Sequence, residues 1–227
     1  MVQRGLSILV VSTAPERRTV GRKFIDFIGG RDFLMSSPAD QQRALATLPN
    51  GTPYWGSTSL NSVSGEIPVG FDFVTHDWTL EFWYRLSASP GATVSGPACG
   101  LPDGWAGSAG RLWFFVYNVS TGGLDLTQHT TASGTYRSAS SAGISSNVDY
   151  CVHMLMPTGA GATIYLNNVA GTTGGAPSGT ARVPDGSHRM MLRSGSFSTV
   201  GIAYPALYRR LLTAEERQRH IVTMTAA

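Results

Sequence analysis

The sequence predicts an all-β protein: an antiparallel β-sandwich (jelly roll) with one short C-terminal helix and an N-terminal arm. Three observations support this fold class. Glycine, serine and threonine make up about a third of the 227 residues and only 14% are charged, which suits short strands joined by turns better than helices with charged faces. Apolar residues alternate along several segments. One run near the C-terminus carries the capping residues of a helix.

Residues 1–50 differ in character from the rest of the chain. We expect two short strands at Leu6–Val11 and Val20–Ile28, then a short helix over Ser37–Leu48. Ser37 would be the N-cap of that helix and Pro38 its first residue. The segment is either the edge of the sandwich or an arm that anchors the chain on a neighbouring subunit. We therefore divide the chain into residues 1–50 and a sandwich domain of residues 51–227.

The clearest strand pattern runs from Asp77 to Leu86. Its alternate residues share one face and are assigned to the core: Trp78, Leu80, Phe82, Tyr84 and Leu86. Further strands are expected at 111–118, 149–156, 162–166 and 189–193, with glycine-rich loops at 87–110, 132–147 and 171–186. This succession of strands and loops favours an antiparallel sandwich or jelly roll.

The stretch Gly201–His220 is predicted to be a strand, a tight turn and a helix. Thr213 and Glu216 have the spacing of a capping box, in which each side chain bonds a backbone N–H of the first turn. Glu215–Arg219 and Glu216–His220 are expected to pair along the helix at i,i+4 spacing.

Three stretches together resemble the laminin G-like, concanavalin A-like jelly roll: WTLEFW at 78–83, TIYLNN at 163–168 and ALYRRLLTAEE at 206–216. The resemblance covers roughly residues 52–222. Asn167 and Asn168 stand where many members carry a glycine, and asparagine also tolerates a positive φ, so the turn is retained. The family includes lectins, adhesion modules, pentraxin-like proteins, some glycosidases and viral surface proteins. The fold therefore does not decide the function.

Charge is unevenly distributed along the chain. The net charge is +3 over residues 1–50, −4 over 51–180 and +4 over 181–227, which argues against a nucleic-acid partner because no face carries a dense cationic stripe. The basic residues near the two ends are candidates for docking on an acidic protein surface: Arg4, Arg17, Arg18, Arg22, Lys23, Arg209 and Arg210. We expect no membrane insertion, because the apolar run Leu6–Val11 is far shorter than the ~20 residues a span requires.

The sequence does not indicate an enzyme. The catalytic branch of the resembled superfamily carries Glu-x-Asp-x-Glu on one strand, and no such run occurs here. Asp77 and Glu81 share a strand face but lie about 13 Å apart at ~3.3 Å per residue, which is too far for the two carboxylates of a glycosidase. The histidines show no metal-ligand spacing. Cys99 and Cys151 are expected to be buried free thiols.

Two kinds of ligand remain for the loops. Calcium is the one metal that the resemblance suggests, because lectins often hold Ca²⁺ in a rim loop. Asp103, Asp125 and Asp185 are isolated and each is more simply a turn residue, but Asp103 is the best candidate ligand. A glycan ring could stack on Trp105 or Tyr136, which lie among small residues, with Asp103 taking hydroxyls. Packing over a neighbouring loop or subunit is the alternative for both aromatics.

We expect a non-enzymatic virion surface protein, such as a capsid decoration or fibre component of a tailed bacteriophage. The chain carries a jelly roll without a convincing export signal, and free thiols suit synthesis in the host cytoplasm. Expected partners are capsid or tail subunits, further copies of the chain and a host-surface glycan. The alternative is a secreted or cell-surface glycan-binding lectin, and a glycoside hydrolase ranks third.

Overall fold

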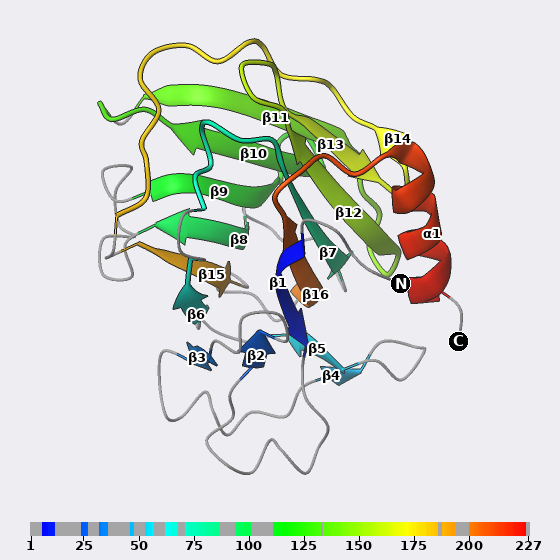
Figure 1. Ribbon diagram of the computed structural model, residues 1–227. Coiled ribbons are helices and arrows are strands. Elements are labelled where there is room, and N and C mark those ends of the chain that lie inside the picture. The colour runs from blue at the N-terminus through cyan, green and yellow to red at the C-terminus, as the bar shows by residue number, and fades with distance from the viewer. Residues whose placement is uncertain are drawn as a thin grey trace.

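Two antiparallel sheets face each other, and one helix packs on the outside of the second sheet (Figure 1). The computed structural model describes residues 6–11, 24–26, 32–35, 46–47, 53–56, 62–67, 71–86, 94–100, 111–132, 134–185, 188–193 and 200–225. The sequence's prediction of an all-β sandwich closed by a C-terminal helix is confirmed.

The first sheet has the strand order β11-β10-β9-β8-β15-β6-β3. Its strands are β3 (Asp32–Met35), β6 (Ser62–Glu66), β8 (Val94–Gly100), β9 (Arg111–Asn118), β10 (Gly123–His129), β11 (Thr135–Gly143) and β15 (Arg189–Arg193). Every pairing in it is antiparallel. Strand β11 forms one end of this order, so the face built by β9, β10 and β11 lies at that end of the sheet.

The second sheet has the order β1-β16-β7-β12-β13-β14, and β2 joins it to β3 of the first. Its strands are β1 (Leu6–Val11), β2 (Phe24–Asp26), β7 (Trp78–Leu86), β12 (Asp149–Met156), β13 (Thr163–Leu166), β14 (Val169–Ala170) and β16 (Val200–Tyr208). A short strand β5 (Pro53–Gly56) pairs with β16 and with β4 (Ala46–Thr47). Strand β1 hydrogen-bonds with β16 and β2, so residues of the N-terminal segment take part in the sheet.

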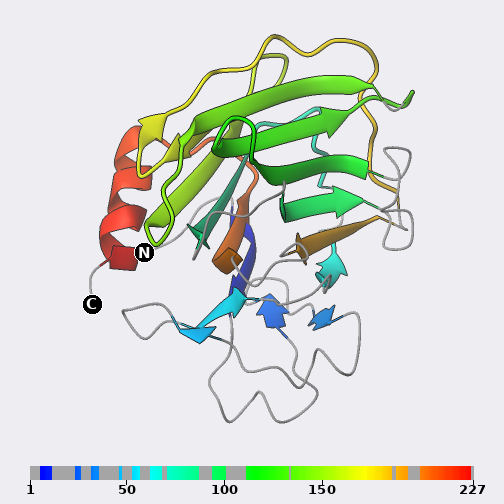
Figure 2. The same ribbon diagram turned by 180° about the vertical axis from the view of Figure 1, so that it is seen from behind.

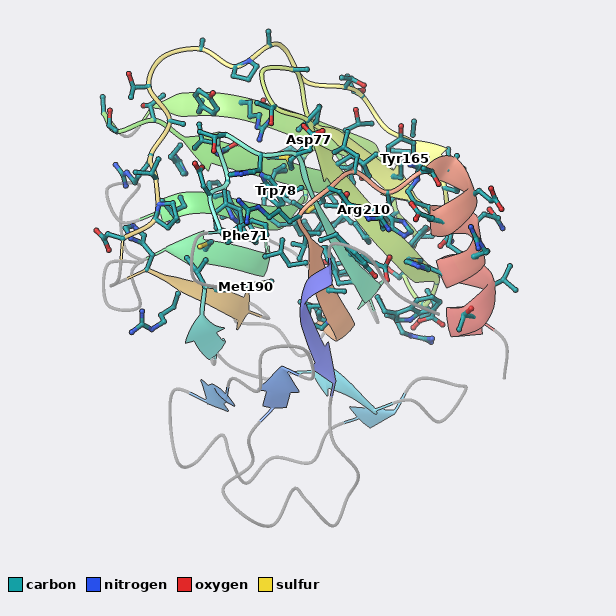
Figure 3. All side chains as sticks on the ribbon, viewed as in Figure 1. Phe71, Asp77, Trp78, Tyr165, Met190 and Arg210 are labelled. Carbon is teal, nitrogen blue, oxygen red and sulfur yellow. The ribbon has the colours of Figure 1, made fainter. Side chains whose placement is uncertain are left out.

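The core lies between the two sheets and is rich in aromatic rings. Trp78 of β7 and Trp113 of β9 come from opposite sheets, with ring centroids 5.6 Å apart. Phe82 and Phe115 make a second contact between the same two strands at 4.9 Å, edge to face, which is a favoured geometry for aromatic pairs. All four rings are fully buried, and Figure 3 shows Trp78 within this layer. The alternation read along Asp77–Leu86 thus assigned the core correctly.

Helix α1 (Ala214–Thr225) begins at the predicted cap. The Thr213 amide donates to Glu216 Oε2 at 2.9 Å, and the Glu216 amide donates to Thr213 Oγ1 at 3.2 Å. Arg219 pairs with Glu215 at 3.4 Å as expected. The predicted Glu216–His220 pair is replaced, because Glu216 binds Arg210 and His220 turns to Glu81 on the sheet.

Other local predictions had mixed outcomes. Asn167 and Asn168 have φ values of 47° and 67°, which confirms the asparagine turn. Strands β8 and β11 lie inside segments that were expected to be loops, and Ala46–Thr47 is strand rather than the end of a helix. Strands rich in glycine and small residues, such as VSGPACG in β8 and TYRSASSAG in β11, lack the apolar alternation by which strands are recognised. No helix in the described part of the chain is long and apolar enough to span a membrane.

Candidate ligand-binding face

The outer surface of β9, β10 and β11 presents a half-buried aromatic ring among polar side chains. Register places Phe114, Thr127 and Ser138 side by side across the three strands, and Val116, Asp125 and Ser140 form the next row. Their neighbours along the strands alternate inward to the core, which sends these side chains outward. We call this surface the β9–β11 face: Phe114, Val116, Asn118, Asp125, Thr127, His129, Tyr136, Ser138 and Ser140.

An aromatic stack forms the centre of this face. The Phe114 ring lies against the imidazole of His129, with centroids 5.4 Å apart and planes tilted by 22°. The Arg111 guanidinium lies 5.1 Å from the Phe114 centroid, and burial lowers the pKa of this arginine. Phe114 keeps part of its surface exposed while His129 is buried. The buried histidine therefore packs against the phenylalanine ring, part of which remains exposed.

A polar pair lies one row from the stack. Asn118 Nδ2 donates to Asp125 Oδ2 at 2.6 Å, and Asn118 Oδ1 accepts from the Ser120 amide at 3.0 Å. Among the described residues nothing hydrogen-bonds the other carboxylate oxygen of Asp125, Oδ1, which is buried. Such an unpaired buried acceptor is uncommon in native proteins and indicates an unfilled partner position. Sequence reasoning treated Asp125 as a turn residue, whereas it lies within β10.

Residues 171–185, which we call the rim segment, border the face along β11 (Figure 2). The amides of Thr172 and Ser178 donate to the carbonyls of Ser140 and Tyr136, both at 2.9 Å. Further on, Arg182 donates through its amide to the His129 carbonyl at 3.1 Å. The rim segment thus closes the free edge of β11 and limits the face on that side.

The structure brings only some of the predicted site residues to this face. Tyr136 lies on it, half-buried, with its ring centroid 6.0 Å from the Arg137 guanidinium. Trp105, Asp103, Arg4, Arg17, Arg18, Arg22 and Lys23 lie outside the described residues.

The two predicted docking arginines near the C-terminus lie beside α1 instead. Arg210, labelled in Figure 3, makes two 2.7 Å hydrogen bonds to Glu216. Arg209 is exposed and donates to His76 Nε2 at 2.6 Å. The third predicted aspartate, Asp185, bonds His188 Nδ1 at 2.8 Å within a turn.

A second cluster of titratable groups lies on the opposite sheet, beneath α1. Glu81 of β7 and His153 of β12 face each other in register, with Oε2 and Nε2 3.1 Å apart. His220 of α1 reaches the same oxygen through Nδ1 at 2.6 Å. Burial opposes ionisation of Glu81, but the hydrogen bonds with both histidines outweigh it and lower its pKa. Sequence spacing missed this cluster because its members are 72 and 67 positions apart.

The two histidines of this cluster have different electrostatic environments. Burial lowers the pKa of His153, while the hydrogen bond with Glu81 raises that of His220. Cys151 Sγ lies 3.8 Å from His153 Nε2, and burial raises the pKa of this thiol. The same imidazole nitrogen faces both the thiol and the carboxylate, so these residues are not arranged as a Cys–His–acid triad, which uses the two ring nitrogens separately.

Comparison with known proteins identifies the fold. No family model and no curated protein sequence matches the chain. The receptor-binding domain of botulinum neurotoxin mosaic serotype C/D superposes with a TM-score of 0.70 at 10% identity, covering 95% of this chain and 50% of that one. The binding domain of botulinum neurotoxin DC in complex with SialylT gives 0.70 at 9% identity, with 97% and 51% covered.

A Trypanosoma rangeli sialidase in complex with sialic acid gives a TM-score of 0.61 at 17% identity, covering 97% of this chain and 33% of the sialidase. The chain thus spans about half the length of the toxin domains and a third of the enzyme. At these identities the likeness concerns the architecture. This protein is a β-sandwich of the kind found in those binding domains.

Proposed function

We propose that this chain is a carbohydrate-binding module without catalytic activity, and that its glycan lies on the β9–β11 face. The observation that carries the proposal is the half-buried Phe114 ring, stacked on His129, one row from the Asn118–Asp125 pair. An aromatic face accepts the C–H groups of a sugar ring, while amide and carboxylate groups bind its hydroxyls. Aromatic walls with a few fixed polar groups are typical of small-molecule sites.

Glycans that end in sialic acid are the first ligand class to test. A toxin binding domain of the same fold was solved with SialylT, and the sialidase with sialic acid. On the β9–β11 face the Arg111 guanidinium beside Phe114 would favour an acidic sugar. A cation next to a stacking ring attracts a carboxylate that the ring alone would not bind.

A non-catalytic role fits the positions of the candidate acids. Asp77 is exposed and accepts a hydrogen bond from the Thr158 amide at 2.7 Å. Glu81 is buried under α1 between two histidines. The two carboxyl groups therefore have separate structural roles, rather than flanking a cleft as a hydrolase requires.

The test is a glycan array followed by titration of the best-bound sugar. We expect wild-type binding, and a loss of affinity of about tenfold for Phe114→Ala, which corresponds to ~1.4 kcal/mol. Val169→Ala, on the other sheet and 63% exposed, is the matched control and should bind as wild type. Trp105→Ala and Tyr136→Ala test the two aromatics predicted from sequence. Unchanged affinity of the Phe114 variant, or an array without binding, would contradict the proposal.

We further propose that the chain acts on a virion surface, with host glycans as ligands and capsid or tail subunits as partners. Support comes from Cys99 and Cys151, two buried cysteines that form no disulfide, which suits synthesis in a reducing cytoplasm. Of the predicted docking residues, Arg209 is described and exposed, so it could meet an acidic partner surface. The protein should co-sediment with particles in a symmetric copy number, and Arg209→Glu should reduce incorporation. Secretion as a free protein would favour the lectin alternative.

A further inference from the structure

Three potential metal ligands from three different elements meet beneath α1. Glu81 Oε2 of β7, His153 Nε2 of β12 and His220 Nδ1 of α1 all lie within 4.8 Å of one another. The carboxylate oxygen is 3.1 Å from one imidazole nitrogen and 2.6 Å from the other. Residues so far apart in the sequence share one point only because the strand register and the position of the helix bring them together.

We propose that Glu81, His153 and His220 bind a single zinc-class transition-metal ion that fastens α1 to the sheet. Two imidazole nitrogens and one carboxylate oxygen are an established donor set for Zn²⁺. Tetrahedral ligation with bonds of 2.0–2.3 Å places ligand atoms about 3.3–3.6 Å apart. The Glu81–His153 separation of 3.1 Å is close to this spacing. To reach this spacing, the distance between Glu81 Oε2 and His220 Nδ1 must increase from 2.6 Å by about 1 Å or less. A small rotation of the carboxylate is enough for this.

Cys151 is the candidate for a fourth ligand, although it lies outside the group of three whose ligand atoms are all within 4.8 Å of one another. It lies two residues before His153 on β12, so both side chains leave the same face of the strand, and Sγ is 3.8 Å from His153 Nε2. Metal binding would release the thiol proton, and any proton on His220, to solvent. The charges then balance, because two positive charges on the ion meet one carboxylate and one thiolate, with both imidazoles neutral.

The surroundings favour a structural rather than a catalytic ion. The side chains of Glu81 and His153 are 3% and 0% exposed, whereas that of His220 is 16% exposed. An ion would therefore enter beside the helix and be sealed on the sheet side. Tyr208 stacks on the His220 ring with centroids 6.0 Å apart and holds its plane. Among the described residues nothing hydrogen-bonds His153 Nδ1, so this ring is oriented through Nε2, the atom that faces the cluster.

The experiment uses the full chain, stripped with a chelator and then titrated with Zn²⁺. We expect one zinc per chain by mass spectrometry, and a rise in the midpoint of thermal unfolding when zinc is added. His220→Gln should weaken zinc affinity at least about 100-fold, since losing even an outer-shell partner costs 10–100-fold. The matched control is His76→Gln. His76 lies outside the cluster and contacts Arg209, so this variant should bind zinc as the wild type does.

Two further measurements keep the outcome decisive. Glu81→Gln, which keeps the volume of the side chain, should also lose zinc while circular dichroism shows a folded β protein. Cobalt substitution should give a thiolate charge-transfer band that Cys151→Ala removes; absence of that band would overturn Cys151 as a ligand. A folded wild-type protein that takes up no zinc, or equal uptake by wild type and His220→Gln, would overturn the site itself.

Discussion

Arg137 donates from Nε to Gln128 Oε1 at 2.6 Å, and both side chains are buried inside the first sheet. Gln128 extends this hydrogen-bond network, because its side-chain amide nitrogen donates to the Phe73 carbonyl at 3.1 Å. Arg137 Nη1 also donates to the Pro157 carbonyl at 2.6 Å. Burial lowers the pKa of Arg137 to about 10, yet the guanidinium remains charged at neutral pH and joins β10 and β11 to two loops.

We expect Arg137→Met to destabilise the protein by about 3 kcal/mol, because the buried side-chain oxygen of Gln128 and the part-buried carbonyl of Pro157 lose their arginine donor. The matched control is Arg85→Met, because the Arg85–Asp149 pair is partly exposed. The loss of this pair should lower the free energy of unfolding by about 1 kcal/mol or less. Urea unfolding monitored by tryptophan fluorescence measures both. Equal free energies of unfolding for the two variants would show that the buried network contributes little.

The ionisation of Glu216 makes the free energy of unfolding depend on pH in the acid range. Its hydrogen bonds with Arg210 lower its pKa to about 2, against 4.5 for the ordinary side chain. The pKa of Glu216 is lower in the folded state than in the unfolded state. Its contribution to the free energy of unfolding is therefore complete above about pH 4.5 and is lost as the pH falls towards 2.

Glu216→Gln should therefore cost about 1 kcal/mol at pH 7, given the partial exposure of the pair, and nothing near pH 2. Thermal unfolding across this range tests the prediction. Glu215→Gln is the control, because the Glu215–Arg219 pair is largely exposed and its loss should cost only a few tenths of a kcal/mol. A wild-type advantage over Glu216→Gln that persists at pH 2 would contradict the prediction.

Asn168 has two separable roles at the turn between β13 and β14. Its φ of 67° lies in the left-handed region, and Oδ1 accepts from Arg217 Nε of α1 at 2.9 Å. Asn168 Nδ2 also donates to the Ala214 carbonyl and to Gln218 Oε1, both at 3.4 Å. Asn168→Gly should lose only these hydrogen bonds to the helix, about 1 kcal/mol in total. Asn168→Ala should lose the same bonds and add backbone strain of about 1–2 kcal/mol. Chemical denaturation of both variants is the measurement, and an alanine variant as stable as the glycine variant would refute the strain argument.

Gly174 permits the rim segment to approach β11. A Cβ built there would overlap the carbonyl oxygen of Ser138, whereas a Cβ on Gly175 would meet nothing within 4 Å. Gly174→Ala should displace the rim segment and expose the amides of Thr172 and Ser178 to hydrogen exchange, while Gly175→Ala should leave their protection unchanged. If both variants exchange as wild type does, the close approach at Gly174 is unimportant.

Much of the fold could be predicted from the sequence because its signals are local. Alternation from Trp78 to Leu86 assigns a strand and its core face, since side chains along a strand point alternately to opposite sides. The capping pair Thr213–Glu216 fixes the start of α1 through atoms within four residues of each other. Strand β11 escaped prediction because, apart from Tyr136, its outward residues are small, and its buried Arg137 carries a charge.

Only the tertiary structure decided which side chains meet. The sequence assigns Glu81 to the non-core face of β7, yet this residue is buried because α1 covers that face. Glu81 contacts His153 because of the register between β7 and β12, and it contacts His220 because of the position at which α1 packs on the sheet. In the same way, Phe114 and Asp125 share a face through cross-strand pairing. Local sequence determines the elements, but the sites depend on long-range packing, which no residue spacing encodes.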